Sequence, residues 1–157
     1  MTGVPGDQIG PLMHQLVPMV ETLGLEYVEV STVRAVVVLR DNPAYRNHVG
    51  GPHAAASFAV AESATGAIAV AAFGDLLDRA VLLPTTATMD YLAVAMGDLT
   101  ATAEIVGDVV VAREEFEAGK RPQFDIVAEI TDTQGVTTGR LRATWTLKRL
   151  RTAATPV

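Results

Sequence analysis

The chain has 157 residues, 49% of them hydrophobic and 19% charged, so it is long enough for one domain with a substantial core and too apolar for a disordered chain. The net charge of −6 argues against nonspecific binding to nucleic acid, because that binding needs clustered Lys and Arg to displace counterions. The absence of cysteine excludes disulfides, thiolate metal sites and cysteine nucleophiles. It also suits a reducing compartment, and we expect a cytoplasmic protein.

No membrane-directed segment is expected. The first residues carry neither a basic stretch nor an apolar stretch of the kind found in signal peptides. The longest apolar segment is interrupted by Glu62, Asp75 and Asp78, which argues against a membrane span.

The first third of the chain predicts a helix and two strands. The helix covers residues 7–23, is broken near Pro18 and ends at Gly24. Two strands follow at residues 25–30 and 33–40, joined by a tight corner at Ser31-Thr32. Residues 41–45 form a loop after the second strand.

A long helix is predicted over residues 52–73. Pro52 suits its first turn and Gly74 suits its end. Because the segment is apolar on nearly every side, the helix should be buried.

The second half of the chain predicts strands. Four are expected as an antiparallel meander, at residues 80–92, 99–112, 122–131 and 136–149, with a hairpin turn at 132–135. The simplest way to bury the long helix is a curved antiparallel sheet wrapped around it, an α+β architecture. We expect a single domain over 1–157, with an N-terminal helix and lead-in at 1–24, a core at 25–149 and a disordered tail at 150–157.

A motif lies at the start of the long helix. The pattern Asn-x-x-Gly-x-x-His, with an acidic residue nine positions after the His, occurs at Asn47, Gly50, His53 and Glu62. With the order of elements, it resembles the hotdog fold and, within that fold, the phenylacetyl-CoA (PaaI) type of acyl-CoA thioesterase. The resemblance covers most of residues 25–149.

The resemblance has further landmarks and two departures. Tyr91 and Gly97-Asp98 match the strand pair that follows the helix in that family. The family often has His-Gly-Gly at the helix start, where this chain has two alanines after His53, and its acid is often Asp instead of Glu.

The spacing of His53 and Glu62 predicts a shared site. Nine helical steps turn the side chains by roughly 180° and separate them by about 13.5 Å along the axis, too far to serve one substrate atom within one chain. Side-by-side helices of a two-fold dimer would bring His53 of one subunit to Glu62 of the other, and the resemblance also implies a dimer. We therefore expect a homodimer, and two such dimers could pair into a dimer of dimers. Gly66 would allow a neighbouring helix or a ligand to approach closely.

The resemblance implies hydrolysis of a small-molecule acyl thioester. The Ala54 N–H would stabilise the oxyanion, and Glu62, whose pKa burial should raise, would be the general base or the nucleophile. His53 would bond to the substrate or orient the loop, and Asn47 would hold water or fix the loop. Supporting roles are expected for the remaining candidates: Gly50, Gly51, Thr85, Thr86 and Thr88. No cofactor is expected beyond the coenzyme A of the substrate, and no metal, because the three histidines lack ligand spacing.

Other interpretations stay open. Taken alone, Glu62 could be a solvated break in the helix, His53 a cap, Asn47 a turn residue and the threonines ordinary strand residues. A non-catalytic hotdog dimer that binds acyl-CoA, a fatty acid or another partner is the main alternative. A third is an enoyl-CoA hydratase, since Asp41-Asn42-Pro43 resembles a hydratase segment but lacks its His.

Overall fold

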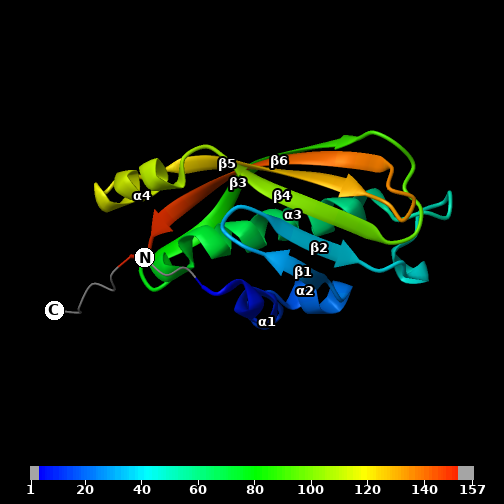
Figure 1. The fold of residues 1–157 in the computed structure, drawn as a ribbon, viewed down its shortest axis with the longest axis horizontal. Coiled ribbons are helices and arrows are strands. Elements are labelled where there is room, and N and C mark those ends of the chain that lie inside the picture. Colours follow the sequence, from blue (N-terminus) through cyan, green and yellow to red (C-terminus); the bar gives the residue numbers. More distant parts are fainter. Residues whose placement is uncertain (1–3, 152–157) are drawn as a thin grey trace.

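A six-stranded antiparallel sheet wraps one long helix in the computed structural model, which describes residues 4–151 (Figure 1). The strands are β1 (Glu26–Val30), β2 (Ala35–Leu39), β3 (Ala80–Tyr91), β4 (Leu99–Val106), β5 (Gln123–Thr131) and β6 (Thr137–Arg149). Their order across the sheet is β1-β2-β4-β5-β6-β3. The predicted architecture, a curved antiparallel sheet around a central helix, is confirmed. The expected tail lies outside the described residues from residue 152 onward.

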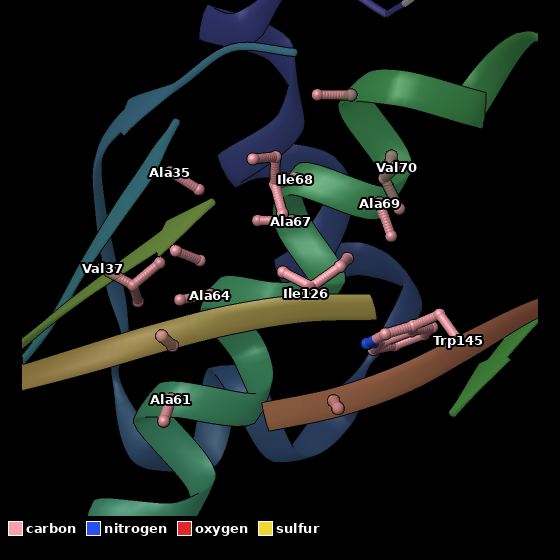
Figure 2. Close-up of a cluster of buried hydrophobic side chains, with 14 of the residues drawn as sticks. Ala35, Val37, Ala61, Ala64, Ala67, Ile68, Ala69, Val70, Ile126 and Trp145 are labelled. Carbon is pink, nitrogen blue, oxygen red and sulfur yellow. The ribbon is translucent and has the colours of Figure 1, made fainter. Parts of the chain in front are cut away.

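The central helix α3 (Ala54–Phe73) is buried because it is apolar all round. By length and composition Ala54–Leu76 could cross a membrane, but 83% of its apolar window is buried inside the structure. The small side chains of α3 let the sheet approach closely, as Figure 2 shows for Ala61, Ala64 and Ala67. Val37 and Ile126 fill the space between helix and sheet.

Two short helices precede the sheet, α1 (Gly6–Leu16) and α2 (Pro18–Leu23). The chain is extended at Val17, so the predicted break before Pro18 is confirmed. Gly24 ends α2 at φ 62°, a conformation that favours glycine. The buried side chains of Met13 and Val20 anchor the two helices in the core. This places α2 beside the first half of α3.

The predicted strand 99–112 is wrong in its second half. β4 ends at Val106, and a helix, α4 (Val109–Glu117), follows. Asp108 starts this helix because its Oδ1 accepts the N–H groups of Val110 and Val111, at 2.8 and 3.4 Å. Burial of Phe116 holds the helix to the core and stabilises it by about 1.5–3 kcal/mol. The cap and this anchor outweigh the strand preference of the three valines.

The predicted four-strand meander is also wrong. Of the four strands predicted for the second half of the chain, only β4, β5 and β6 are consecutive neighbours, whereas β3 pairs with β6 at the far edge of the sheet. β4 pairs instead with β2, which joins the two N-terminal strands to the rest. One sheet can therefore curve around α3 from both sides, and β3 is left with an unpaired outer edge.

Candidate active site

Glu62 lies in the third turn of α3, half-buried, at an apolar cavity of about 500 Å³. The cavity lies between α2 and α3 and is lined by Val17, Met19, Val20, Leu23, Ala55, Phe58, Ala59, Glu62, Ser63 and Tyr91. Glu62 is the only charged side chain among these described residues. A carboxylate in such surroundings has little compensation for its charge.

The electrostatics of Glu62 follow from this position. Burial raises the pKa of its carboxyl group above the ordinary glutamate value. Within residues 4–151 the carboxylate has no hydrogen bond or ion pair. Other acidic side chains are held by arginine, as in the pairs Asp75–Arg113 and Asp125–Arg142. Glu62 is thus a carboxylate of raised basicity facing an apolar space.

Asn47 shapes the loop that leads into α3. Its Nδ2 donates to the Pro52 carbonyl at 3.1 Å, and its Oδ1 accepts from the Val49 N–H at 3.0 Å. Gly50 has φ 87°, and a Cβ on Gly51 would lie 2.1 Å from the Ala95 carbonyl oxygen. Both glycines are therefore needed for the loop geometry, and the Asn47 side chain is engaged in fixing that loop.

His53 is the N-cap of α3. Its Nδ1 accepts the Ala55 N–H at 3.0 Å, so the neutral ring carries its proton on Nε2. Ala54, the preceding residue in this turn, is exposed, and its N–H has no acceptor among the described residues. A free N–H at the start of a long helix is a ready donor to developing negative charge. The structure thus leaves Ala54 available for the role predicted for it.

Tyr91, which the sequence marked only as a landmark, lies between the helix start and Glu62. Its hydroxyl donates to the Ala54 carbonyl at 3.2 Å, and 55% of its surface is exposed. Tyr91 lines both the Glu62 cavity and a second hollow, of about 420 Å³, bordered by Asn47 and Ala54. Its position at the end of β3 is the signal that could have identified it.

One chain does not bring the two halves of the motif together. Glu62 opens into the cavity beside α2, whereas Asn47 and Ala54 border the second hollow. The spacing of His53 and Glu62 on one helix corresponds to about 13.5 Å along its axis.

Gly66 and the threonines lie away from Glu62. Gly66 is buried, and a Cβ there would lie 3.5 Å from the Trp145 ring, so Trp145 is the group that approaches it. The three threonines are exposed on β3. Thr85 donates to the Thr144 carbonyl at 3.0 Å, while Thr86 pairs with Thr144 and Thr88 with Arg142 in the sheet register. None is brought to Glu62 within one chain.

The hydratase-like segment has local contacts of its own. Asp41 binds Arg46 at 2.5 Å, and Asn42 caps the short helix η1 (Pro43–Tyr45) through the Ala44 N–H at 2.9 Å. Within residues 4–151, no three His, Asp or Glu side chains are grouped closely enough to hold a metal ion.

Comparison with solved structures identifies the fold as the hotdog fold. A Pseudomonas aeruginosa protein of unknown function, described as a probable thioesterase, superimposes with a TM-score of 0.81 at 19% identity, covering 95% of this chain and 99% of that one. The Escherichia coli PaaI protein from the phenylacetic acid degradation operon gives 0.69 at 19% identity over 92% of each chain. A Staphylococcus aureus thioesterase gives 0.68 at 19% identity over 84% of this chain and 99% of that one.

The chain belongs to the DUF4442 family, a domain of unknown function, whose model matches residues 7–147. No curated protein matches the sequence.

Proposed function

We propose that this protein is an acyl-CoA thioesterase that works as a homodimer, with Glu62 as its general base. The observation that carries the proposal is the half-buried, unpartnered Glu62 carboxylate at an apolar cavity. Its raised pKa brings the group nearer to neutral pH, where a general base is most effective. The hotdog-fold relatives described as thioesterases support this reaction class.

The proposed reaction uses few groups. The thioester carbonyl oxygen accepts the free Ala54 N–H, where the helix dipole also favours negative charge. Glu62 takes a proton from a water molecule, whose oxygen attacks the carbonyl carbon. The C–S bond then breaks, the proton passes to the leaving sulfur, and a carboxylic acid and a thiol are released. In the variant mechanism, Glu62 attacks the thioester carbonyl carbon directly and forms an anhydride. Transfer of ¹⁸O from solvent into the enzyme carboxylate would distinguish this mechanism.

The polarity of the cavity walls indicates where each part of the substrate would bind. The cavity walls are apolar apart from Glu62, Ser63 and Tyr91, so they suit the hydrocarbon part of an acyl group. The coenzyme A portion would extend past the exposed helix start, where Ala54 and Ala55 lie at the surface.

A second copy of the chain completes the proposed site. The Ala54 donor and Glu62 of one chain open into different hollows, so the donor that serves Glu62 should come from a partner. β3 is a 12-residue strand whose outer edge is unpaired in the monomer, and such edges readily pair with another strand. Exposed apolar side chains continue this edge at Tyr91, Leu92 and Val94. Antiparallel pairing of β3 with its copy is the arrangement that we propose.

Free-thiol release from a panel of acyl-CoAs tests the function. Glu62→Gln should lower the rate by roughly 10²–10⁴-fold while the dimer remains intact by light scattering. Glu114→Gln is the matched control, because Glu114 is an exposed glutamate on the outside of α4. Equal rates for Glu62→Gln and the wild type would refute the assignment.

Non-catalytic binding is the second candidate, and one observation favours it. The His53 ring already accepts the Ala55 N–H and the His53 carbonyl accepts those of Ala56 and Ser57, so Ala54 is the one backbone donor of the first turn without an acceptor among the described residues. A binding protein would be stabilised against heat by acyl-CoA or fatty acid without any thiol release. Steady release above the Glu62→Gln background would exclude that alternative.

A further inference from the structure

Ser63 is a buried serine on α3 that lines the same cavity as Glu62. Only 7% of its surface is exposed, and within residues 4–151 its hydroxyl forms no hydrogen bond. The other hydroxyl side chains of α3 behave differently, because Ser57 and Thr65 donate to backbone carbonyls of their own helix, at 3.5 and 2.7 Å. A buried hydroxyl without a partner is destabilising unless a ligand or water bonds to it.

The helix does not need a hydroxyl at this position. Residues four apart lie on one face of an α-helix, and Ala59, one turn before Ser63, lines the cavity as well. Ala67, one turn after Ser63, is fully buried. Alanine therefore serves the packing of this face on both sides of Ser63, and the serine adds only its hydroxyl group.

Ser63 belongs to the inner part of the cavity. On the α2 side, Val17 and Met19 are 37% and 61% exposed and border the opening, whereas Val20 is fully buried. Ser63 is as deeply buried on the α3 side. A molecule that entered the cavity would therefore bring its innermost part, and not the part left in solvent, to the Ser63 hydroxyl.

Among the described residues, three polar side chains line the cavity, and two of them already have a role. The Tyr91 hydroxyl donates to the Ala54 carbonyl at 3.2 Å. Glu62 binds the attacking water in the proposed reaction. Ser63 is the polar side chain that remains for the acyl group. Because it directly follows Glu62, with a rise of about 1.5 Å along the helix, it lies near the reacting carbonyl carbon.

We propose that Ser63 is a specificity-determining residue that hydrogen-bonds a hydroxyl group on the acyl chain close to the thioester carbonyl, as in a 3-hydroxyacyl group. A serine hydroxyl can both donate to and accept from such a group. A plain hydrocarbon chain would leave the Ser63 hydroxyl unpaired, and a site with an unpaired polar group discriminates against that ligand. The inference rests on the proposed function, because it assigns the cavity to the acyl group.

The direct test compares thiol release from 3-hydroxyhexanoyl-CoA and hexanoyl-CoA. The wild type should have a kcat/KM about tenfold higher for the hydroxylated substrate, and in Ser63→Ala the ratio should fall to about one. Ser57→Ala is the matched control, because Ser57 is equally buried on α3 but bonds to its own helix, and this variant should keep the preference. The same substrate ratio in the wild type and Ser63→Ala would overturn the proposal.

The position of the substrate hydroxyl is tested with 6-hydroxyhexanoyl-CoA. Its hydroxyl lies at the far end of the chain, so the wild type should hydrolyse it no faster than hexanoyl-CoA. A preference for this substrate that disappears in Ser63→Ala would contradict the placement of Ser63 beside the reacting carbonyl.

Thermal unfolding without ligand checks that the Ser63 hydroxyl has no partner within the protein. Ser63→Ala should keep or raise the melting temperature, because alanine is the better helix former and an unpaired hydroxyl is removed. A clear fall in melting temperature would reveal an internal hydrogen bond and would contradict the proposal.

Binding without turnover separates this inference from the proposed function. Calorimetry on Glu62→Gln should show about tenfold tighter binding of 3-hydroxyhexanoyl-CoA than of hexanoyl-CoA, and the double variant with Ser63→Ala should lose that difference. If the wild type hydrolyses neither thioester but this difference is found, the thioesterase proposal fails and the assignment of Ser63 stands. If hydrolysis occurs while Ser63→Ala changes neither ratio, the assignment of Ser63 fails and the thioesterase proposal stands. Binding of neither thioester would overturn the assignment of Ser63.

Discussion

Trp145 on β6 donates its indole N–H to the Thr65 hydroxyl on α3 across 3.1 Å, and both side chains are buried. The same hydroxyl donates to the Glu62 carbonyl oxygen, 2.7 Å away. Thr65 therefore connects the sheet to the helical turn that carries the candidate base. Because the Trp145–Thr65 bond is buried, it should be rigid, and its loss should be measurable in stability.

Thr65→Val should lower the free energy of unfolding by about 1–3 kcal/mol, because it keeps the side-chain shape but leaves the indole N–H unsatisfied. Urea denaturation measures the change. Thr65→Ser retains the hydroxyl and is the control, which should restore part of the difference. Equal stability of Thr65→Val and the wild type would show that the indole bond contributes nothing.

Glu62→Gln should be more stable than the wild type at neutral pH. Burial raises the folded-state pKa of Glu62, so the wild type loses stability as the pH rises from the unfolded glutamate pKa through the higher folded value. The amide has no charge to bury and escapes this loss. Denaturation at several pH values should show the advantage of Glu62→Gln growing through that window and vanishing below about pH 4.5. A constant difference at every pH would indicate that the carboxylate is well solvated.

His14 should stabilise the N-terminal helices in a pH-dependent way. The Glu21 carboxylate and the Leu25 carbonyl raise the pKa of its ring, since both ring nitrogens can donate only when the ring is protonated. The stabilisation is fully present below the unfolded pKa of about 6.5 and is lost as the pH rises through the higher folded value. The stability difference between the wild type and His14→Gln should therefore shrink as the pH rises from about 6.5 through the higher folded-state pKa of His14. A difference that grows with pH would contradict the assigned contacts.

The fold was largely predictable because its strongest signals are long and periodic. A 20-residue apolar helix needs a sheet around it, and the breaks at Pro18 and Gly24 have local causes. The errors lie where a single contact decides whether a segment is helix or strand, or which strand it pairs with. Asp108 caps a helix at a run of valines that favour a strand. The position of β3 is set by its pairing with β6 at the edge of the sheet. Neither is visible in local periodicity.

The candidate site was predictable in part for a similar reason. Glu62 is conspicuous as a carboxylate in an apolar helix, and a helix start always offers free N–H groups. The capping bond of His53 and the loop bonds of Asn47 require coordinates.

Ala54→Pro should abolish the proposed oxyanion donor without unfolding the helix. Proline lacks an N–H and is well tolerated at the first helical position, and His53 already has the extended conformation (φ −65°, ψ 148°) that suits a residue before proline. Thiol release should fall by about 10²–10³-fold with the melting temperature nearly unchanged. Ala55→Pro is the contrasting variant. It removes an N–H that already donates to the His53 ring and leaves the Ala54 N–H in place.

Mixing the two inactive variants tests whether the site is shared between subunits. In a mixed dimer, the Ala54→Pro chain supplies an intact Glu62 and the Glu62→Gln chain supplies an intact Ala54 N–H. If each site takes one group from each chain, one site of the mixed dimer is restored and the other carries both changes. Random exchange makes half of the dimers mixed, so the mixture should recover about a quarter of the wild-type activity. A mixture no more active than its parents would mean that each chain uses its own Ala54 and Glu62, because a mixed dimer then contains no intact site.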